Sequence, residues 1–130
     1  MKTVLFVCVH NSGRSQMAEA FFKALAGGKA RAISAGTKPA ARVNATVAAA
    51  MKEVGIDISR RKPKALTFEM MEKADRAITM GCGVAESCPA SFAPTEDWQL
   101  DDPEGKPLEE VRKIRDDIRA RVEKLVGELS

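Results

Sequence analysis

A cysteine and an arginine six positions apart stand out at the end of the first apolar run of this 130-residue chain. Cys8 follows the run Thr3 to Val7, and Arg14 comes after the short intervening stretch VHNSG. A loop from a buried strand into a helix offers backbone N–H groups that point one way, and the helix dipole adds a positive end. The planar guanidinium of Arg14 supplies a further fork of donors. The spacing therefore predicts an oxyanion-binding loop that holds a nucleophilic Cys8 thiolate beneath the anion.

The predicted oxyanion-binding residues are those that follow Cys8. They are Val9, His10, Asn11, Ser12, Gly13, Arg14 and Ser15. The stretch is no Walker loop, because it lacks Gly-Lys-Ser/Thr. His10 is the only histidine of the chain, and we expect it to have a structural or rim role, because an ionised Cys8 needs no base.

The elements that must position this loop follow from the apolar pattern. Buried runs predict strands over residues 3–7, 30–35, 76–80 and around 97–100, and helical spacing predicts helices over 15–25, 43–54, 68–73 and 108–129. Thr67 is the expected N-cap of the third helix. Strands alternating with helices predict one α/β domain, residues 1–130, with a four-stranded parallel sheet and helices on both faces. Sites in such sheets open at the carboxyl ends of the strands, where Cys8 and Cys82 are expected to meet.

The bulk composition bounds the class of protein. With 45% hydrophobic and 30% charged residues the chain is typical of a globular domain, and no apolar run is long enough to span a membrane. No signal peptide is recognisable, so the cytoplasm is the expected compartment. Residues 1–64 hold 12 Lys and Arg against three Asp and Glu, a balance of +9, whereas residues 65–130 hold nine against 15, a balance of −6. Because the aromatic residues fall mostly at core-like positions, we expect this basic half to steer an oxyanion rather than bind nucleic acid.

The three cysteines are Cys8, Cys82 and Cys88. An odd number in a cytosolic chain does not indicate a disulfide framework. One histidine and the absence of a C-x2-C pair argue against a metal site, and we expect no cofactor. Reactive thiol chemistry is the better interpretation.

Four segments carry a resemblance to a known family. They are CVHNSGRSQMAEAFF from Cys8, SAGT from Ser34, TMGCG from Thr79 and EDWQLDDPEG from Glu96. Together they resemble the low-molecular-weight protein tyrosine phosphatases and the arsenate reductases built on the same fold. The resemblance covers essentially the whole chain, and its later segments look like the thioredoxin-coupled arsenate reductases.

The resemblance implies a reaction. Cys8 would attack the oxyanion, and Asp102, just before a proline, would protonate the leaving oxygen; the neighbouring Asp101 is not the expected acid. Cys82 would then attack Cys8, releasing arsenite and leaving a Cys8–Cys82 disulfide. Cys88 would attack Cys82, and a thioredoxin-like protein would reduce the Cys82–Cys88 pair. The partners implied are arsenate, with phosphate or sulfate as competitors, and a reducing protein.

Three alternatives stay open. A phosphatase would hydrolyse the Cys8 adduct with water, although a chain without tyrosine offers few aromatic walls for phosphotyrosine. Glutaredoxin with glutathione could replace thioredoxin, because only five residues separate Cys82 from Cys88 where many thioredoxin-coupled members have six. A non-catalytic oxyanion-binding module is the third.

A cation site is a further point of departure. Some family members bind a monovalent cation, and the matching positions here are Asn11, Glu19 and Ser34. Lys64 stands where the family has an aspartate. We therefore expect the Lys64 ammonium to pair with Glu19 in place of the cation.

Overall fold

Four parallel strands form one sheet in this structure, a computed structural model that describes residues 2–80 and 95–129. The strands are β1 (Lys2–Cys8), β2 (Ala30–Gly36), β3 (Arg76–Thr79) and β4 (Thr95–Asp97), in the order β2-β1-β3-β4. The register pairs Cys8 with Gly36, and Thr79 with both Val7 and Asp97. The carboxyl ends of all four strands therefore meet at one edge of the sheet, as predicted.

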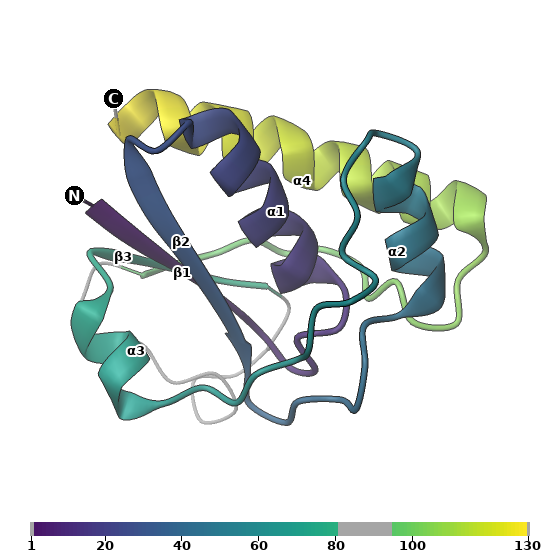
Figure 1. Ribbon diagram of the computed structural model, residues 1–130, viewed down its shortest axis with the longest axis horizontal. Helices are drawn as coiled ribbons and strands as arrows, with labels where there is room; N and C mark the ends of the chain where they lie inside the picture. The colour runs from purple at the N-terminus through teal and green to yellow at the C-terminus, as the bar shows by residue number, and fades with distance from the viewer. Residues whose placement is uncertain (1, 81–94, 130) are drawn as a thin grey trace.

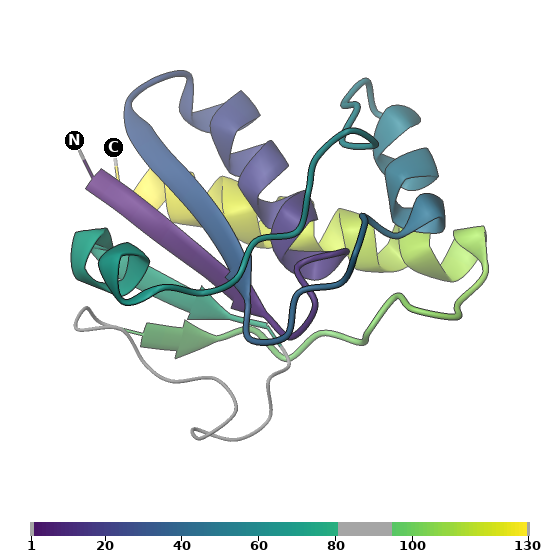
Figure 2. The ribbon, with the colours of Figure 1, turned by 60° about the horizontal axis from the view of Figure 1, so that its bottom comes forward.

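Helices cover both faces of the sheet. They are α1 (Arg14–Ala26), α2 (Ala45–Lys52), α3 (Phe68–Lys73) and α4 (Leu108–Leu129). Helices α1, α2 and α4 lie together over one face, and α3 lies over the other (Figures 1 and 2). The predicted four-stranded sheet with helices on both faces is confirmed.

The alternation of side chains along β1 builds two cores. Val4, Phe6 and Cys8 join the larger core beneath α1, α2 and α4, whereas Leu5 and Val7 join a smaller one on the α3 side. Successive side chains of a strand point to opposite faces, so a strand buried on both sides reads as a continuous apolar run. Among the described residues, no helix is long and apolar enough to cross a membrane.

Two of the helices are capped by side chains at their N-termini. Asn44 Oδ1 accepts hydrogen bonds from the amides of Thr46 and Val47, and the Thr67 hydroxyl accepts one from the amide of Met70. The Thr67 cap was predicted. Such caps satisfy the backbone donors that a first turn leaves without partners.

The predicted fourth strand was placed too late along the chain. The observed strand β4 covers Thr95–Asp97 rather than residues 97–100. Trp98 still donates its amide to the carbonyl of Thr79, the last residue of β3, at 2.8 Å. Because β3 ends there, residue 99 onward has no strand to pair with and leaves the sheet.

Candidate active site

The residues that follow β1, Val9–Ser15, form a loop that we call the anion loop. It is held in place by hydrogen bonds that its backbone carbonyl groups accept. A strap of residues 37–44 runs beside it and donates four backbone hydrogen bonds to it and to the end of β1. The pairs are Thr37 N to Cys8 O (3.2 Å), Lys38 N to Val9 O (2.8 Å), Ala40 N to His10 O (3.0 Å) and Asn44 N to Ser12 O (2.9 Å). In a trans peptide the next N–H points opposite to the carbonyl. The strap therefore turns the N–H groups of the anion loop towards its concave side.

Helix α1 adds its own donors to this concave side. Its N-cap is Gly13, which offers no side chain to the first turn, in contrast to Asn44 and Thr67 on the other helices. An uncapped helix N-terminus that faces a curled loop is a ready anion site. The geometry supports the prediction that this loop binds an oxyanion.

Gly36, at the end of β2, allows the close approach of sheet and loop. A Cβ at this position would lie 2.6 Å from the carbonyl oxygen of Val9 and 2.9 Å from the amide nitrogen of Asn11. Both neighbours are backbone atoms and cannot move aside cheaply. This explains the glycine of the SAGT segment.

The sulfur of Cys8 is surrounded by an ordered set of donors. Its Sγ lies 2.9 Å from Ser15 Oγ and 3.2 Å from the Asn11 amide. Asn11 Nδ2 donates to Ser15 Oγ at 2.7 Å, which leaves the serine hydrogen free to point at sulfur. The amide of Lys64 fixes the Asn11 side chain, because it donates to Oδ1 at 2.9 Å and so orients Nδ2 towards Ser15. These contacts fix the position of the sulfur at the base of the anion loop.

Asn11 is the pivot of the loop. It is fully buried, and its φ of 52° places it in the left-handed region, where it is the one residue other than glycine among those described. Asparagine tolerates this conformation better than most side chains. Its Oδ1 also accepts a hydrogen bond from Gln16 Nε2 at 3.0 Å, so three hydrogen bonds of one side chain fix the loop.

Arg14 joins the anion loop to a second segment, residues 100–104 (the acid loop). The arginine is 6% exposed, and its Nη1 donates to the carbonyl of Leu100 at 3.1 Å. Its Nη2 lies 3.9 Å from Asp102 Oδ2, on a carboxyl that is half exposed. The Asp102 carboxyl thus lies close to the end of the anion loop, and its role as the general acid stays a prediction.

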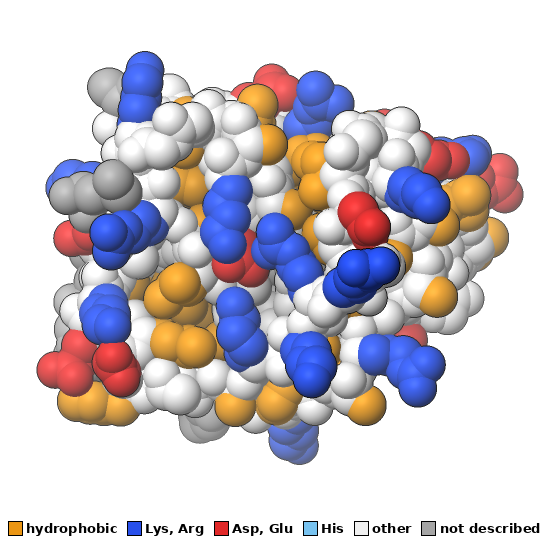
Figure 3. All heavy atoms as spheres, viewed as in Figure 1, with side chains coloured by type: hydrophobic (Ala, Val, Ile, Leu, Met, Phe, Trp, Pro, Cys, Tyr) orange, Lys and Arg blue, Asp and Glu red, His pale blue; other side chains and the backbone are white. Residues whose placement is uncertain are grey.

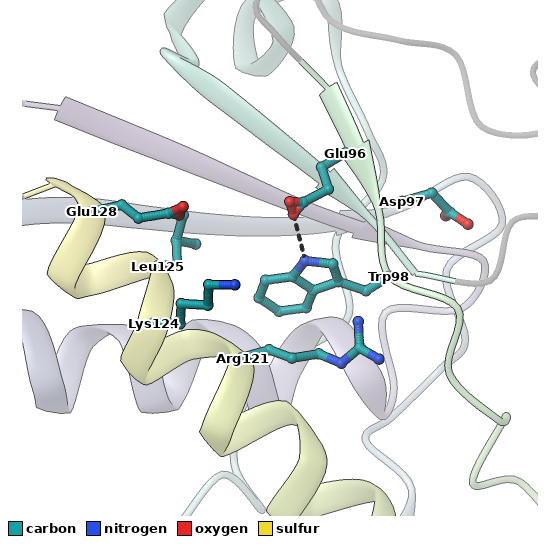
Figure 4. Close-up of a pocket in the computed structure, with 7 residues that line it drawn as sticks. All are labelled: Glu96, Asp97, Trp98, Arg121, Lys124, Leu125 and Glu128. Carbon is teal, nitrogen blue, oxygen red and sulfur yellow. Dashed lines mark hydrogen bonds between the residues drawn. The ribbon is translucent and has the colours of Figure 1, made fainter.

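Trp98 anchors the chain just before the acid loop. Its ring packs against Phe6 with centroids 6.0 Å apart, its Nε1 donates to Glu96 Oε1 at 3.0 Å, and the Arg121 guanidinium lies over it (Figure 4). The hollow of about 220 Å³ beside this ring is lined by charged side chains of β4 and α4. Cys8 does not line this hollow, so the hollow is not the expected substrate site. Its walls hold Trp98 in place.

The residues matched to a cation site form a compact ionic cluster instead. Glu19 is 2% exposed; its Oε1 accepts from Ser34 Oγ (2.7 Å), and Arg61 Nη1 lies 3.2 Å from the same oxygen. Its Oε2 lies 3.0 Å from Lys23 Nζ and 3.8 Å from Lys64 Nζ. Three cationic side chains already surround the one carboxylate, so this set of residues does not fit an added potassium ion. The predicted pairing of Lys64 with Glu19 is present in the structure.

The structure brings some of the predicted site residues together and leaves others undescribed. Cys8, Arg14 and Asp102 share the carboxyl edge of the sheet, whereas Cys82 and Cys88 lie outside the described residues. The contacts of Gln16 with Asn11 and of Arg61 with Glu19 were not predicted from the sequence. The contact of Lys23 with Glu19 had a signal in their i,i+4 spacing on one helix; Arg61, 42 residues away from Glu19, had none.

The uneven distribution of charge along the sequence is visible on the surface of the molecule. The face over which β2 and the connection from α2 to α3 run shows mainly Lys and Arg among its charged side chains (Figures 1 and 3). Such a field attracts oxyanions to the molecule.

A loop with a cysteine at its base, an arginine at its end and an aspartate near that arginine is the arrangement expected of proteins that act on oxyanions with a thiol. The chain belongs to the family described as low molecular weight phosphotyrosine protein phosphatase, which it matches over residues 3–130. The predicted family and fold are confirmed.

Relatives named as arsenate reductases match the whole chain. The "Glutaredoxin arsenate reductase" of Synechocystis is 42% identical and is covered over 100% of both chains. A solved structure of "an arsenate reductase in the phosphate binding state" superposes with a TM-score of 0.90 at 42% identity, again over 100% of both chains. A thioredoxin-dependent arsenate reductase of Corynebacterium glutamicum is 36% identical with a TM-score of 0.84, over 99% of this chain and 62% of that one.

Proposed function

We propose that this protein is an arsenate reductase that uses Cys8 as its nucleophile. The observation that carries the proposal is the anion loop itself. Its carbonyl groups bond to the strap, the buried Cys8 Sγ lies at its base against Asn11 N and Ser15 Oγ, and Arg14 at its end contacts the acid loop. Arsenate is a tetrahedral oxyanion that matches such a loop. The names of the full-length relatives support arsenate as the substrate.

The chain's own residues supply each step of the first half-reaction. The N–H groups of the anion loop and the guanidinium of Arg14 bind the oxygens of arsenate and stabilise the charge that develops on them. Cys8 Sγ forms a bond to arsenic, and one As–O bond breaks. Asp102 gives its proton to the departing oxygen, which leaves as water.

The second half-reaction needs two electrons, and the sequence provides two further thiols for them. In our proposal the thiolate of Cys82 attacks Cys8 Sγ, an S–S bond forms, and the pair of the broken S–As bond stays on arsenic as arsenite. Cys88 then attacks Cys82 and frees Cys8. The resulting Cys82–Cys88 disulfide is reduced by thioredoxin.

Glutaredoxin is the alternative to thioredoxin as the reducing protein. The Synechocystis relative is named for glutaredoxin, whereas the Corynebacterium glutamicum structure is thioredoxin-dependent. Either donor places the cycle in a reducing compartment, so we retain the cytoplasm as the expected location. The two donors predict different roles for Cys88, because a glutathione-linked cycle can end on a small thiol instead of an internal disulfide.

The test is arsenate-dependent NADPH oxidation by the purified protein in two arms. One arm contains thioredoxin and thioredoxin reductase; the other contains glutathione, glutaredoxin and glutathione reductase. We expect turnover in the thioredoxin arm, and we expect Cys88→Ser to abolish it. Turnover confined to the glutaredoxin arm would reassign the reductant. Hydrolysis of p-nitrophenyl phosphate without arsenate reduction would instead make the protein a phosphatase, the second function that its family allows.

A further inference from the structure

The anion loop has two ionisable side chains, Arg14 and His10. The proposed reaction gives Arg14 a role but leaves His10 without one. Its carbonyl accepts a hydrogen bond from Ala40 N, and its ring Nδ1 lies 3.1 Å from the carbonyl oxygen of Lys38. A carbonyl can only accept, so Nδ1 carries the hydrogen of this bond. Both the backbone and the ring of His10 are therefore tied to the strap.

The other side of the ring faces the acid loop. With Nδ1 engaged, Nε2 lies 3.9 Å from Glu104 Oε2. Glu104 in turn donates its amide to Asp102 Oδ1 at 3.0 Å, while Asp102 Oδ2 lies 3.9 Å from Arg14. A series of contacts thus runs from the strap through His10 and Glu104 to Asp102, in which the His10–Glu104 step is an ion pair at 3.9 Å when the ring is protonated.

A second contact limits how the acid loop can move. A Cβ at Gly13 would lie 2.8 Å from Pro103 Cγ, so Pro103 sits directly on the backbone of the anion loop. Pro103 is thus a fixed point between Asp102 and Glu104. Across it, the Glu104 amide donates to Asp102 Oδ1, so the backbone position of Glu104 bears on where the Asp102 carboxyl lies.

We propose that His10 and Glu104 are positioning residues that hold the carboxyl of Asp102 over the anion loop. The expected effect on kcat rests on the proposed function, whereas the expected effect on the position of Asp102 does not. His10 does not act as a base here: its two ring nitrogens face the strap and the acid loop, and the partners of Cys8 Sγ are Ser15 and Asn11. Its backbone N–H remains part of the oxyanion nest in any side-chain variant.

The kinetic test is a double-mutant cycle on arsenate reduction with His10→Ala and Asp102→Asn. We expect His10→Ala to lower kcat about fivefold, a fraction of the 10²–10⁴ of a general acid, because Asp102 is misplaced rather than removed. KM for arsenate should change less than about twofold, because the two ring nitrogens face the strap and the acid loop. In the Asp102→Asn background the same change should have almost no effect. Equal losses in both backgrounds, or an unchanged kcat, would overturn the proposal.

Glu104→Ala has a matched control in Glu109→Ala. Both remove an exposed carboxylate, but Glu109 lies in the first turn of α4. We expect Glu104→Ala to reproduce the loss of kcat seen for His10→Ala and Glu109→Ala to leave kcat as in the wild type. Equal effects of the two variants would mean that general charge, rather than position, is responsible, and would contradict the inference.

A measurement that needs no turnover keeps the inference separate from the proposed function. Solvent exchange of the Glu104 amide, measured by NMR, reports the bond to Asp102. We expect exchange at least about threefold faster in His10→Ala, with the Asn44 amide unchanged as the internal control. An unchanged Glu104 rate would refute the positioning role. Absence of arsenate turnover in the wild type would refute the function alone, and the exchange result would still decide the role of His10.

Discussion

Replacement of Asn11 by alanine tests how the anion loop is held. Asn11 is fully buried. Asn11→Ala removes the two hydrogen bonds that its Oδ1 accepts from Gln16 Nε2 and the Lys64 amide, and the one that its Nδ2 donates to Ser15 Oγ. Each bond contributes about 0.5–1.5 kcal/mol net, and a buried donor left without a partner costs about 1–3 kcal/mol. The left-handed φ of 52° adds about 1 kcal/mol for alanine. We therefore expect a loss of at least about 3.5 kcal/mol, which is large against a typical total of about 5–15 kcal/mol.

Asn44→Ala is the matched control. Asn44 accepts two backbone hydrogen bonds as the N-cap of α2, has an ordinary φ of −60°, and its loss should cost about 1 kcal/mol. Urea unfolding followed by the fluorescence of the single tryptophan, the buried Trp98, gives both free energies. A loss for Asn11→Ala no larger than that for Asn44→Ala would refute the reasoning.

Three further predictions address charge. Arg14→Lys should lower kcat/KM for arsenate about 100-fold, because an ammonium replaces neither the planar fork nor the bond to Leu100; steady-state kinetics that show less than a fivefold loss would contradict this. Replacing sodium by potassium should leave Tm unchanged, because Glu19 is already paired with three cationic side chains; a potassium-specific rise measured by calorimetry would contradict it. Hydrogen bonding and charge from Arg112 and Arg115 lower the pKa of Glu53 from 4.5 to about 2, with Arg112 the larger contributor. The stabilisation from this carboxylate is therefore present above pH 4.5 and is lost as the pH falls towards 2, so the Tm difference between wild type and Glu53→Gln should shrink over that interval.

The fold was predictable from the sequence where apolar periodicity was strong. The long final helix and the cap at Thr67 came out at their observed positions, because both depend on local patterns that a window of residues contains. Strand β4 was displaced by a few residues because its end is set by where β3 stops, which is a property of the partner strand. Local sequence does not contain that information.

The candidate site divides in the same way. Cys8 and Arg14 were predicted from their spacing around a strand-to-helix turn, and Asp102 from resemblance. The contacts of Arg61 with Glu19 and of His10 with Glu104 join residues 42 and 94 positions apart. Neither pair has a periodic or motif signature, so only the folded chain reveals them.

A single-turnover experiment tests the central claim most directly. Fully reduced protein is mixed with arsenate in the absence of any reductant, and arsenite and free thiols are counted per chain. The proposed relay predicts one arsenite per chain and the loss of two of the three thiols, because the reduction of As(V) to As(III) takes the two electrons that two thiols release when they form one disulfide. Cys8→Ser should give neither product. Three intact thiols and no arsenite in the wild type would contradict the account.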